Sequence, residues 1–224
     1  MTTLGDQHRT STFKPRRRPL SPSRRALFER LSVSLCLPVD GPRFDPVGEF
    51  GGAAPLVLDI GIGSGHALTT QAAAEPGIDV IGADVHTPGI ASTLARIESM
   101  GLANVRLVHG DALRFADRLA PGSLDGIRIY FPDPWPKARH RNRRMVSAAN
   151  VDLFYRLLAP GGTLHLATDI DDYADMVLSL CGGHADLDGG VVDRPAERPV
   201  TRYERKGLDA GRVVTDLIYR RRAR

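Results

Sequence analysis

Short apolar segments alternate with longer amphipathic segments through most of this chain, and this alternation limits its fold more than any other feature. The short segments are rich in Val, Ile and Leu, as buried strands are. Strands that alternate with helices form a parallel sheet covered on both faces. The sequence therefore predicts a doubly wound, Rossmann-like α/β sheet that is mostly parallel, with a late antiparallel strand. The expected strands are residues 56–60, 80–83, 105–108, 126–131, 163–167 and, last, 213–219.

The chain before residue 55 has a different character. Residues 1–22 are basic and lack apolar periodicity, which predicts a mobile arm. Residues 23–36 place Leu27, Leu31 and Leu35 on one helical face, and Ser23 can cap that helix. Residues 37–54 are rich in Pro and Gly and are expected to form a linker. Residues 23–54 are thus an N-terminal helix and linker, and residues 55–224 the main domain.

The net charge of +4 says little by itself, but the cations are segregated along the chain. Clustered cations suit a polyanion such as RNA. For the first cluster, a solvated basic tail is an equally simple explanation. The clusters are Arg16-Arg17-Arg18 with Arg24-Arg25, then Lys137, Arg139, Arg141, Arg143 and Arg144, and finally Arg220-Arg221-Arg222.

Several classes of protein do not fit this sequence. It has no apolar run long enough to span a bilayer, and its first thirty residues lack the apolar core of a secretory signal. Cys36 and Cys181 have no metal-ligand spacing, so no metal site is predicted. We therefore expect reduced cysteines and a cytoplasmic protein without a membrane partner.

A glycine-rich turn follows the first expected strand of the main domain. It reads Asp59-Ile60-Gly61-Ile62-Gly63-Ser64-Gly65 and opens a helix. Glycines let the backbone turn sharply and approach a ligand closely. The pattern alone is a weak signal, because NAD enzymes use a related one and a tight turn without a ligand is also possible.

Two more acids narrow the choice of ligand. Asp84 ends the second strand, where a carboxylate can accept from both hydroxyls of a ribose. Asp111 follows the third strand and can accept from an adenine amino group, or cap the next helix, or do both. Asp59 precedes the glycines and can face a cationic methionine end. Together they resemble the S-adenosyl-L-methionine site of class I methyltransferases more than an NAD site, and we see no residues for hydride chemistry.

The fourth strand leads into a loop that combines an acid, an aromatic ring and a basic run. Residues 131–144 read FPDPWPKARHRNRR. Ligands of open α/β sheets bind beyond the carboxyl ends of the strands, so this loop is expected to face the methyl donor. Three prolines stiffen the loop around Asp133 and Trp135. Trp135 can either stack on a base or pack inward, and the sequence leaves both open.

This loop resembles the P-D-P-W-x-K-x-R-H-x-K-R-R signature of the bacterial tRNA (guanine-N7-)-methyltransferase family. Further segments resemble motifs of the same family, so the likeness covers roughly residues 55–220. Asp59, Asp84, Asn142 and Arg202-Tyr203 depart from the residues common in the family, and none of these departures removes a reactive group. The further segments are GADVHTPG at 82–89, TD with YA at 168–174, and RPVTRYERKG at 198–207.

The resemblance implies transfer of a methyl group from S-adenosyl-L-methionine to N7 of guanine 46 in the tRNA variable loop. It further implies a partner tRNA and no obligate protein partner, with the enzyme a monomer or a homodimer. The donor residues it implies are Asp59, Gly61, Gly63, Gly65, Asp84, Asp111 and Asp133. The substrate residues are Lys137, Asp169, Thr201, Arg202, Tyr203 and Glu204. The RNA contacts are Arg139, His140, Arg141, Asn142, Arg143 and Arg144.

Guanine N7 carries an in-plane lone pair, so the reaction needs alignment and charge stabilisation rather than a base. We expect Asp133 to be the catalytic residue, accepting from the guanine N1–H and amino group and offsetting the charge that develops on the purine. Asp169 can share this work or act as a helix N-cap. Glu204 can hold the ribose or order its own loop. The rival hypotheses are a class I methyltransferase acting on another RNA guanine and a non-catalytic RNA-binding protein.

Overall fold

The computed structural model describes residues 12–13 and 19–223, apart from the side chain of Arg202. Most of the expected basic arm, with Arg16, Arg17 and Arg18, lies outside the described residues. The strands are β1 (Cys36–Leu37), β2 (Leu56–Ile60), β3 (Asp79–Asp84), β4 (Val105–His109), β5 (Leu124–Tyr130), β6 (Leu158–Thr168), β7 (Leu187–Val192) and β8 (Thr215–Arg221). The helices are α1 (Pro22–Leu35), α2 (Pro46–Phe50), α3 (His66–Ala74), α4 (Thr87–Met100), α5 (Ala112–Ala116), α6 (Ala148–Leu157), α7 (Asp171–Gly182), α8 (Arg202–Asp209) and the 3₁₀ helix η1 (Ala138–Arg143).

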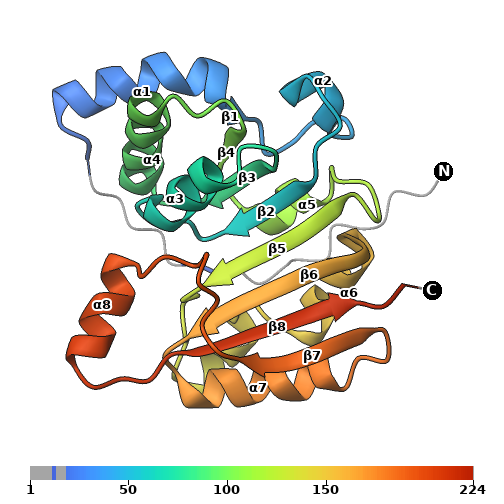
Figure 1. The fold of residues 1–224 in the computed structure, drawn as a ribbon. Coiled ribbons are helices and arrows are strands. Elements are labelled where there is room, and N and C mark those ends of the chain that lie inside the picture. The colour runs from blue at the N-terminus through green and yellow to red at the C-terminus, as the bar shows by residue number, and fades with distance from the viewer. Residues whose placement is uncertain (1–11, 14–18, 224) are drawn as a thin grey trace.

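These strands form one sheet in the order β1-β4-β3-β2-β5-β6-β8-β7 (Figure 1). The pairs from β1 to β6 are parallel, β8 runs antiparallel to β6, and β7 runs antiparallel to β8. The predicted doubly wound, mostly parallel sheet with a late antiparallel strand is therefore confirmed. Each segment expected to be a strand coincides with an observed one, with shifts only at its ends.

The sheet is covered on both faces, which explains why its central strands are mostly apolar. Helices α1, α3 and α4 pack on one face, where Leu68 and Leu94 are fully buried against β3 and β4. Helices α5, α6 and α7 pack on the other face, where Phe115 and Phe154 are buried against the central strands. Each such side chain stabilises the fold by about 1.5–3 kcal/mol relative to an exposed position. Within the described residues, no helix has both the length and the apolar character that crossing a bilayer requires.

Some elements were not predicted, and the reasons are local. Strand β1 is only two residues long. Strand β7 contains Gly189 and Gly190, which hide the strand pattern, and it forms because β8 pairs with it. The segment 37–54, expected as a linker, holds α2 and the second residue of β1, whose first residue, Cys36, was expected in the helix. The expectation that Ser23 caps α1 is wrong, because Pro22 starts that helix and Ser21 is its N-cap.

The sheet order also places the ligand site. Strands β2 and β5 are neighbours, but the chain runs from β2 through α3 to β3 on one side and from β5 through α6 to β6 on the other. A crevice forms at the carboxyl ends of the strands at such a point. In Figure 1 the arrowheads of β2, β5 and β6 reach the same edge of the sheet, and α8 lies beside it.

Candidate functional site

A cavity of about 450 Å³ lies at this edge of the sheet, a size that suits a small cofactor. Residues from the ends of β2, β3, β4 and β5 meet there because the strands are parallel. The cavity wall includes Asp59, Gly61, Gly63, Asp84, Asp111 and Asp133. Of the residues expected to bind the donor, Gly65 alone is not on the wall.

The glycine-rich turn contains two kinds of glycine. All three have positive φ angles, at 80° for Gly61, 57° for Gly63 and 74° for Gly65, which side chains rarely adopt. A Cβ atom on Gly65 would lie 2.2 Å from Oγ1 of Thr93, so this glycine lets α3 pack against α4. Gly61 and Gly63 face open space on the cavity side. Gly61 and Gly63 therefore leave room for a ligand, whereas Gly65 leaves room for α4 to pack closely.

Asp84 is held beside the glycine-rich turn by backbone hydrogen bonds. Its Oδ2 accepts from the Gly63 amide at 2.8 Å, and its Oδ1 accepts from the His86 amide at 2.8 Å. Burial raises the pKa of this carboxyl, although both amides act in the opposite direction. Each carboxylate oxygen keeps a second lone pair. Asp84 can therefore accept from a pair of ribose hydroxyls without leaving its place.

Asp59 forms the floor of the cavity and is only 3% exposed. Burial raises its pKa to about 7, while the nearby Arg128 on β5 lowers it. The two residues face each other in the register of β2 and β5. A carboxyl group that titrates near neutrality therefore lies where a cationic methionine end is expected.

Asp111 has both of the roles that the sequence allowed at this position. It is the N-cap of α5, and its Oδ1 accepts from the Leu113 amide at 2.9 Å. Its side chain also belongs to the cavity wall. The capping bond fixes the carboxylate and leaves its other oxygen for a ligand.

The loop after β5 presents Asp133 at the cavity between two strained residues. Phe131 and Trp135 have φ angles of 53° and 43°, a left-handed conformation that costs a non-glycine residue about 1–2 kcal/mol. Asp133 is exposed and lines the cavity. The Trp135 ring is buried, its Nε1 donates to the Thr12 carbonyl at 3.1 Å, and the Arg143 guanidinium lies 3.8 Å from its centre. Trp135 therefore packs inward and holds the loop.

The basic run after this loop divides into exposed and buried members. Lys137, Arg139, Arg141 and Asn142 are exposed on or next to η1, and His140 is half-buried. Arg143 is half-buried and donates to the Phe13 carbonyl at 3.0 Å.

Arg144 corrects one expectation. Its side chain is 1% exposed, and it donates to the Pro134 carbonyl at 2.9 Å and to Asp172 of α7 at 2.8 Å. A side chain buried to this extent cannot contact RNA, so Arg144 holds the loop instead.

The residues expected to bind substrate also divide into two groups. Thr201 and Tyr203 line the cavity, and the Tyr203 ring lies 5.4 Å from that of Phe131. Asp169 and Glu204 are buried behind the wall, with 4% and 2% of their side chains exposed. Asp169 is not a helix N-cap, because Ile170 is the N-cap of α7. Lys137 is exposed and is not on the cavity wall, and the side chain of Arg202 lies outside the described part of the chain.

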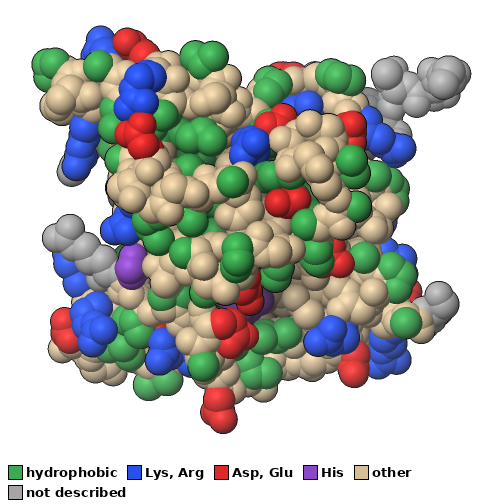
Figure 2. All heavy atoms as spheres, turned by 45° about the horizontal axis from the view of Figure 1, so that its top comes forward, with side chains coloured by type: hydrophobic (Ala, Val, Ile, Leu, Met, Phe, Trp, Pro, Cys, Tyr) green, Lys and Arg blue, Asp and Glu red, His purple; other side chains and the backbone are tan. Residues whose placement is uncertain are grey.

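The third basic cluster lies away from the cavity. Strand β8 runs antiparallel to β6, so Thr215 pairs with Thr168 at the cavity end and Arg220 pairs with Thr163 near the other end. Figure 2 shows the surface indented on the side to which β5 and β6 point, with Lys and Arg side chains on both sides of the indentation.

The structure adds site residues that sequence reasoning missed. The cavity wall also contains Thr12, Phe13, His66, Tyr130 and Met145. Tyr130 had a usable signal, because a polar side chain at the end of a buried strand points to a site. Thr12 and Phe13 had none, since tertiary folding alone brings them to the loop.

The strand order, the glycine-rich turn and the acids at successive strand ends together define a class I methyltransferase. A variant of the 16S rRNA (adenine(1408)-N(1))-methyltransferase from Catenulisporales acidiphilia, solved with cosubstrate SAM, has this fold, with a TM-score of 0.54 and 18% identity over 80% of this chain and 92% of that chain. A family model described as "Putative methyltransferase" matches residues 53–217.

Curated relatives narrow the class to one family. The tRNA (guanine-N(7)-)-methyltransferase of Streptomyces coelicolor is 42% identical over 96% of this chain and 82% of its own length. The enzyme of that name from Nocardioides sp. is 49% identical over 82% of this chain and 75% of its own length. The chain belongs to the tRNA (guanine-N(7)-)-methyltransferase family. It is an enzyme whose methyl donor is S-adenosyl-L-methionine.

Proposed function

We propose that this chain methylates N7 of guanine 46 in the variable loop of tRNA. The observation that carries the proposal is the position of Asp133, which is exposed on the wall of the donor cavity between two strained residues. A loop held in this way at the donor site keeps its carboxylate in one place while a base enters.

The donor residues follow from the cavity wall. When bound, S-adenosyl-L-methionine supplies a methyl group that is already activated on a cationic sulfonium. Asp84 accepts from the ribose hydroxyls, Asp111 from the adenine amino group, and Asp59 faces the methionine end. Gly61 and Gly63 keep the turn above this floor free of side chains, which supports the fit of an extended cofactor.

Asp133 is the catalytic residue in this proposal. Its two carboxylate oxygens accept from the N1–H and the amino group of guanine, a pair of donors that adenine does not present. The same negative charge stabilises the purine as N7 becomes cationic. No residue has to remove a proton before N7 attacks, so the site needs no general base.

The RNA surface lies around the mouth of the cavity. Lys137, Arg139 and Arg141 are exposed next to Asp133 and bind phosphates. Thr201 and Tyr203 form the opposite side of the mouth and hold the guanine nucleotide. The enzyme acts on tRNA in the cytoplasm as a monomer or homodimer, without an obligate protein partner.

Nucleoside mass spectrometry tests the position of the modified base. A tRNA transcript is incubated with the enzyme and labelled donor, digested and mapped, and we expect 7-methylguanine at position 46. A matched transcript with 7-deazaguanine at that position has no N7 lone pair and is expected to stay unlabelled. Equal labelling of both transcripts would show that another guanine or another atom is the acceptor.

A further inference from the structure

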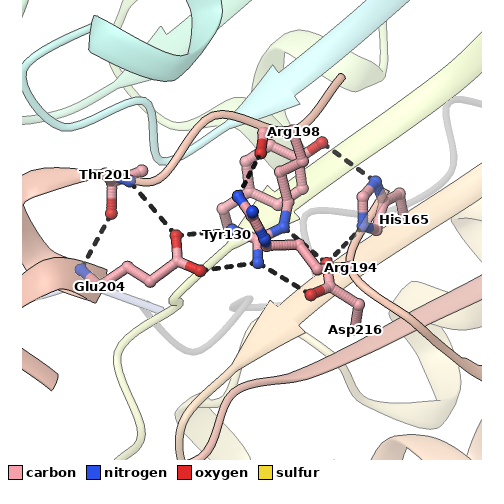
Figure 3. A network of polar contacts seen from close by, with 7 residues as sticks. All are labelled: Tyr130, His165, Arg194, Arg198, Thr201, Glu204 and Asp216. Atoms are coloured by element: carbon pink, nitrogen blue, oxygen red, sulfur yellow. Dashed lines mark hydrogen bonds and ion pairs between the residues drawn. The ribbon is translucent and has the colours of Figure 1, made fainter. Parts of the chain in front are cut away.

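A buried polar network lies between the donor cavity and the first turn of α8 (Figure 3). Arg198 is at its centre and has no exposed side-chain surface. Arg198 is not part of the cavity wall, so its position gives it no direct role in binding the donor or the substrate. Its contacts nevertheless reach both sides of the site.

Two carboxylates surround the Arg198 guanidinium. Nη1 and Nη2 donate to the two oxygens of Glu204, each at 2.8 Å, and Nη2 also donates to Oδ2 of Asp216 at 2.8 Å. Nε lies 2.6 Å from Oδ1 of Asp216, as an ion pair without an aligned hydrogen bond. Planar forks of this kind fix direction as well as distance, which a lysine ammonium cannot do.

From Asp216 the network continues to the donor cavity. Asp216 accepts from Nε2 of His165 at 2.8 Å, and Nδ1 of His165 lies 3.0 Å from the hydroxyl of Tyr130. With the proton on Nε2, the neutral imidazole accepts from this hydroxyl, so both bonds are satisfied. Burial raises the pKa of Asp216, but His165 and Arg198 outweigh it and hold that pKa below its usual range. Tyr130 is part of the cavity wall.

From Glu204 the network continues to the substrate side. Glu204 accepts from the Thr201 amide at 3.2 Å, and the Thr201 hydroxyl accepts from the Glu204 amide at 3.0 Å. These reciprocal bonds form a capping box at the start of α8. Thr201 is on the cavity wall, whereas Glu204 uses its carboxylate on Arg198 and the cap.

Arg198 also contacts the start of the loop that carries Asp133. Its guanidinium carbon lies 5.7 Å from the ring centre of Tyr130 and 5.8 Å from that of Phe131. Phe131 is the strained residue that starts the Asp133 loop, and its ring packs against Tyr203 of α8. Arg198 therefore lies beside the place where the start of the Asp133 loop packs against α8.

A buried ion cluster is a poor way to gain stability alone, because apolar residues of similar volume often stabilise a core equally well. What the charged cluster supplies is orientation, since each of its bonds has a fixed direction. The elements that it orients carry Thr201 on one side and Asp133 on the other.

We propose that Arg198 is a positioning residue for methyl transfer, which fixes the first turn of α8 against the wall of the donor cavity. Glu204 then acts through Arg198 and the capping box and is not a ligand of the substrate. This inference rests on the proposed function, because it assumes that the guanine binds on the side of the cavity formed by α8.

Arg198→Met and Arg198→Lys test the proposal. Steady-state kinetics on tRNA, calorimetry of donor binding and hydrogen exchange of the α8 amides are measured on each variant. For Arg198→Met we expect kcat to fall about 100-fold, as a misplacement of about 1 Å can cause. The donor Kd should stay within about twofold, and the α8 amides should exchange faster. Arg198→Lys should recover only part of the rate, because an ammonium cannot span both carboxylates.

Arg106→Met is the matched control. Arg106 also forms a partly buried pair with a glutamate, its Nε lying 2.6 Å from Oε1 of Glu49. It lies on β4, which β3, β2, β5 and β6 separate from β8. This variant should lose stability while kcat and the exchange of α8 remain as in the wild type. An equal loss of kcat in both variants would show a general effect of stability and overturn the proposal.

Glu204→Gln keeps the proposal testable if Arg198→Met does not fold. The amide retains the volume and an oxygen for the cap, but it weakens the ion pair, so we expect faster α8 exchange and a lower kcat with little change in the tRNA Kd. A weaker tRNA Kd with unchanged exchange would make Glu204 a direct ligand and overturn the proposal. If the wild type methylates a different guanine, the proposed position fails, and these measurements on that guanine still test Arg198.

Discussion

Arg212 covers Asp169: its Nη1 lies 2.8 Å from Oδ2 of that carboxylate, whose side chain is 4% exposed. The contact is an ion pair rather than an aligned hydrogen bond, because Oδ2 has no partner of hydrogen-bond geometry among the described residues. Arg212 is 40% exposed, and its guanidinium carbon lies 5.6 Å from the ring centre of Tyr203. Arg212, three residues beyond the end of α8, thus shields the acid that follows β6 from the solvent.

We expect Arg212→Met to lower the free energy of unfolding by about 1–3 kcal/mol, because a buried carboxylate loses the cation that pairs with it. Urea unfolding at pH 7 measures this loss. In a double-mutant cycle with Asp169→Asn, the double variant should lose less than the sum of the two single losses. Additive losses would show that the ion pair contributes nothing.

Asp133→Ala should lower kcat by about 10²–10³-fold, the usual effect of removing one group that stabilises transition-state charge. Donor binding should survive in part, because the other wall residues remain. Single-turnover methylation and calorimetry separate the two effects. A kcat like that of the wild type would remove Asp133 from the catalytic site.

Asp84→Ala should weaken donor binding by about 1.5–3 kcal/mol, the value of hydrogen bonds to a charged group. Part of this loss comes from the turn, because Asp84 also holds the Gly63 and His86 amides. Asp84→Asn keeps one oxygen acceptor and should lose less. Calorimetry with S-adenosyl-L-methionine measures both, and tRNA affinity should barely change. An unchanged donor Kd in both variants would mean that Asp84 only supports the turn.

Donor affinity should depend on pH through Asp59, because burial raises its pKa to about 7 in the free enzyme. A cationic donor favours the ionised carboxylate, so affinity should rise with pH and level off above 7. At pH 6 the Kd should be about tenfold weaker than at pH 8, since one pKa unit corresponds to a factor of ten. Asp59→Asn should remove this dependence and leave only the titration of the donor itself. A Kd ratio equal in wild type and variant would contradict the assignment.

The same carboxyl group should affect stability with the opposite sign. Its pKa in the unfolded chain is near 3.8 and in the folded protein about 7, so the folded state holds the extra proton between these values. The free energy of unfolding should therefore fall as pH rises across this window, and less so in Asp59→Asn. Urea unfolding of both proteins from pH 4 to pH 8 tests this sign.

Removing two exposed cations of η1 should change the salt dependence of tRNA binding. The double variant Arg139→Gln, Arg141→Gln should flatten the slope of log K against log salt by about 1–2 units, about one per phosphate contact. Arg141 pairs with Asp172 in the free protein, but an exposed pair of this kind is weak. Arg220→Gln, Arg222→Gln removes the same charge at the other end of the sheet and should leave the slope unchanged. Equal slopes in both double variants would place the RNA elsewhere.

The gathering of the acids and glycines on one cavity wall could be predicted from the sequence because it depends on local rules. Asp59, Asp84 and Asp111 lie at or just beyond the carboxyl ends of successive strands, and a parallel sheet brings such ends to one edge. The glycines indicate a sharp turn after β2, and Gly61 and Gly63 adopt positive φ angles in it. These contacts lie within a few residues of a strand, so periodicity and turn chemistry were sufficient.

The substrate side could not be predicted in the same way. The basic run gave no sign that Arg144 is buried while Arg139 is exposed, because that depends on where α7 packs. The burial of Asp169 and Glu204 depends on Arg212 and Arg198, which reach them only after the last strands have joined the sheet.

The sequence alone determined the doubly wound, mostly parallel sheet and the gathering of its glycines and acids at one edge, because each follows from a repeating pattern or a short motif. Only the tertiary structure decided which charged residues face the cavity and which hold it together. The physical reason is that burying a charge costs free energy unless an opposite charge pairs with it. The same arginine or aspartate can therefore be exposed, or be buried where such a partner lies beside it. Those partners are distant in the chain, as Arg198 and Asp216 are, and only the packed strands bring them within 2.6 Å of each other.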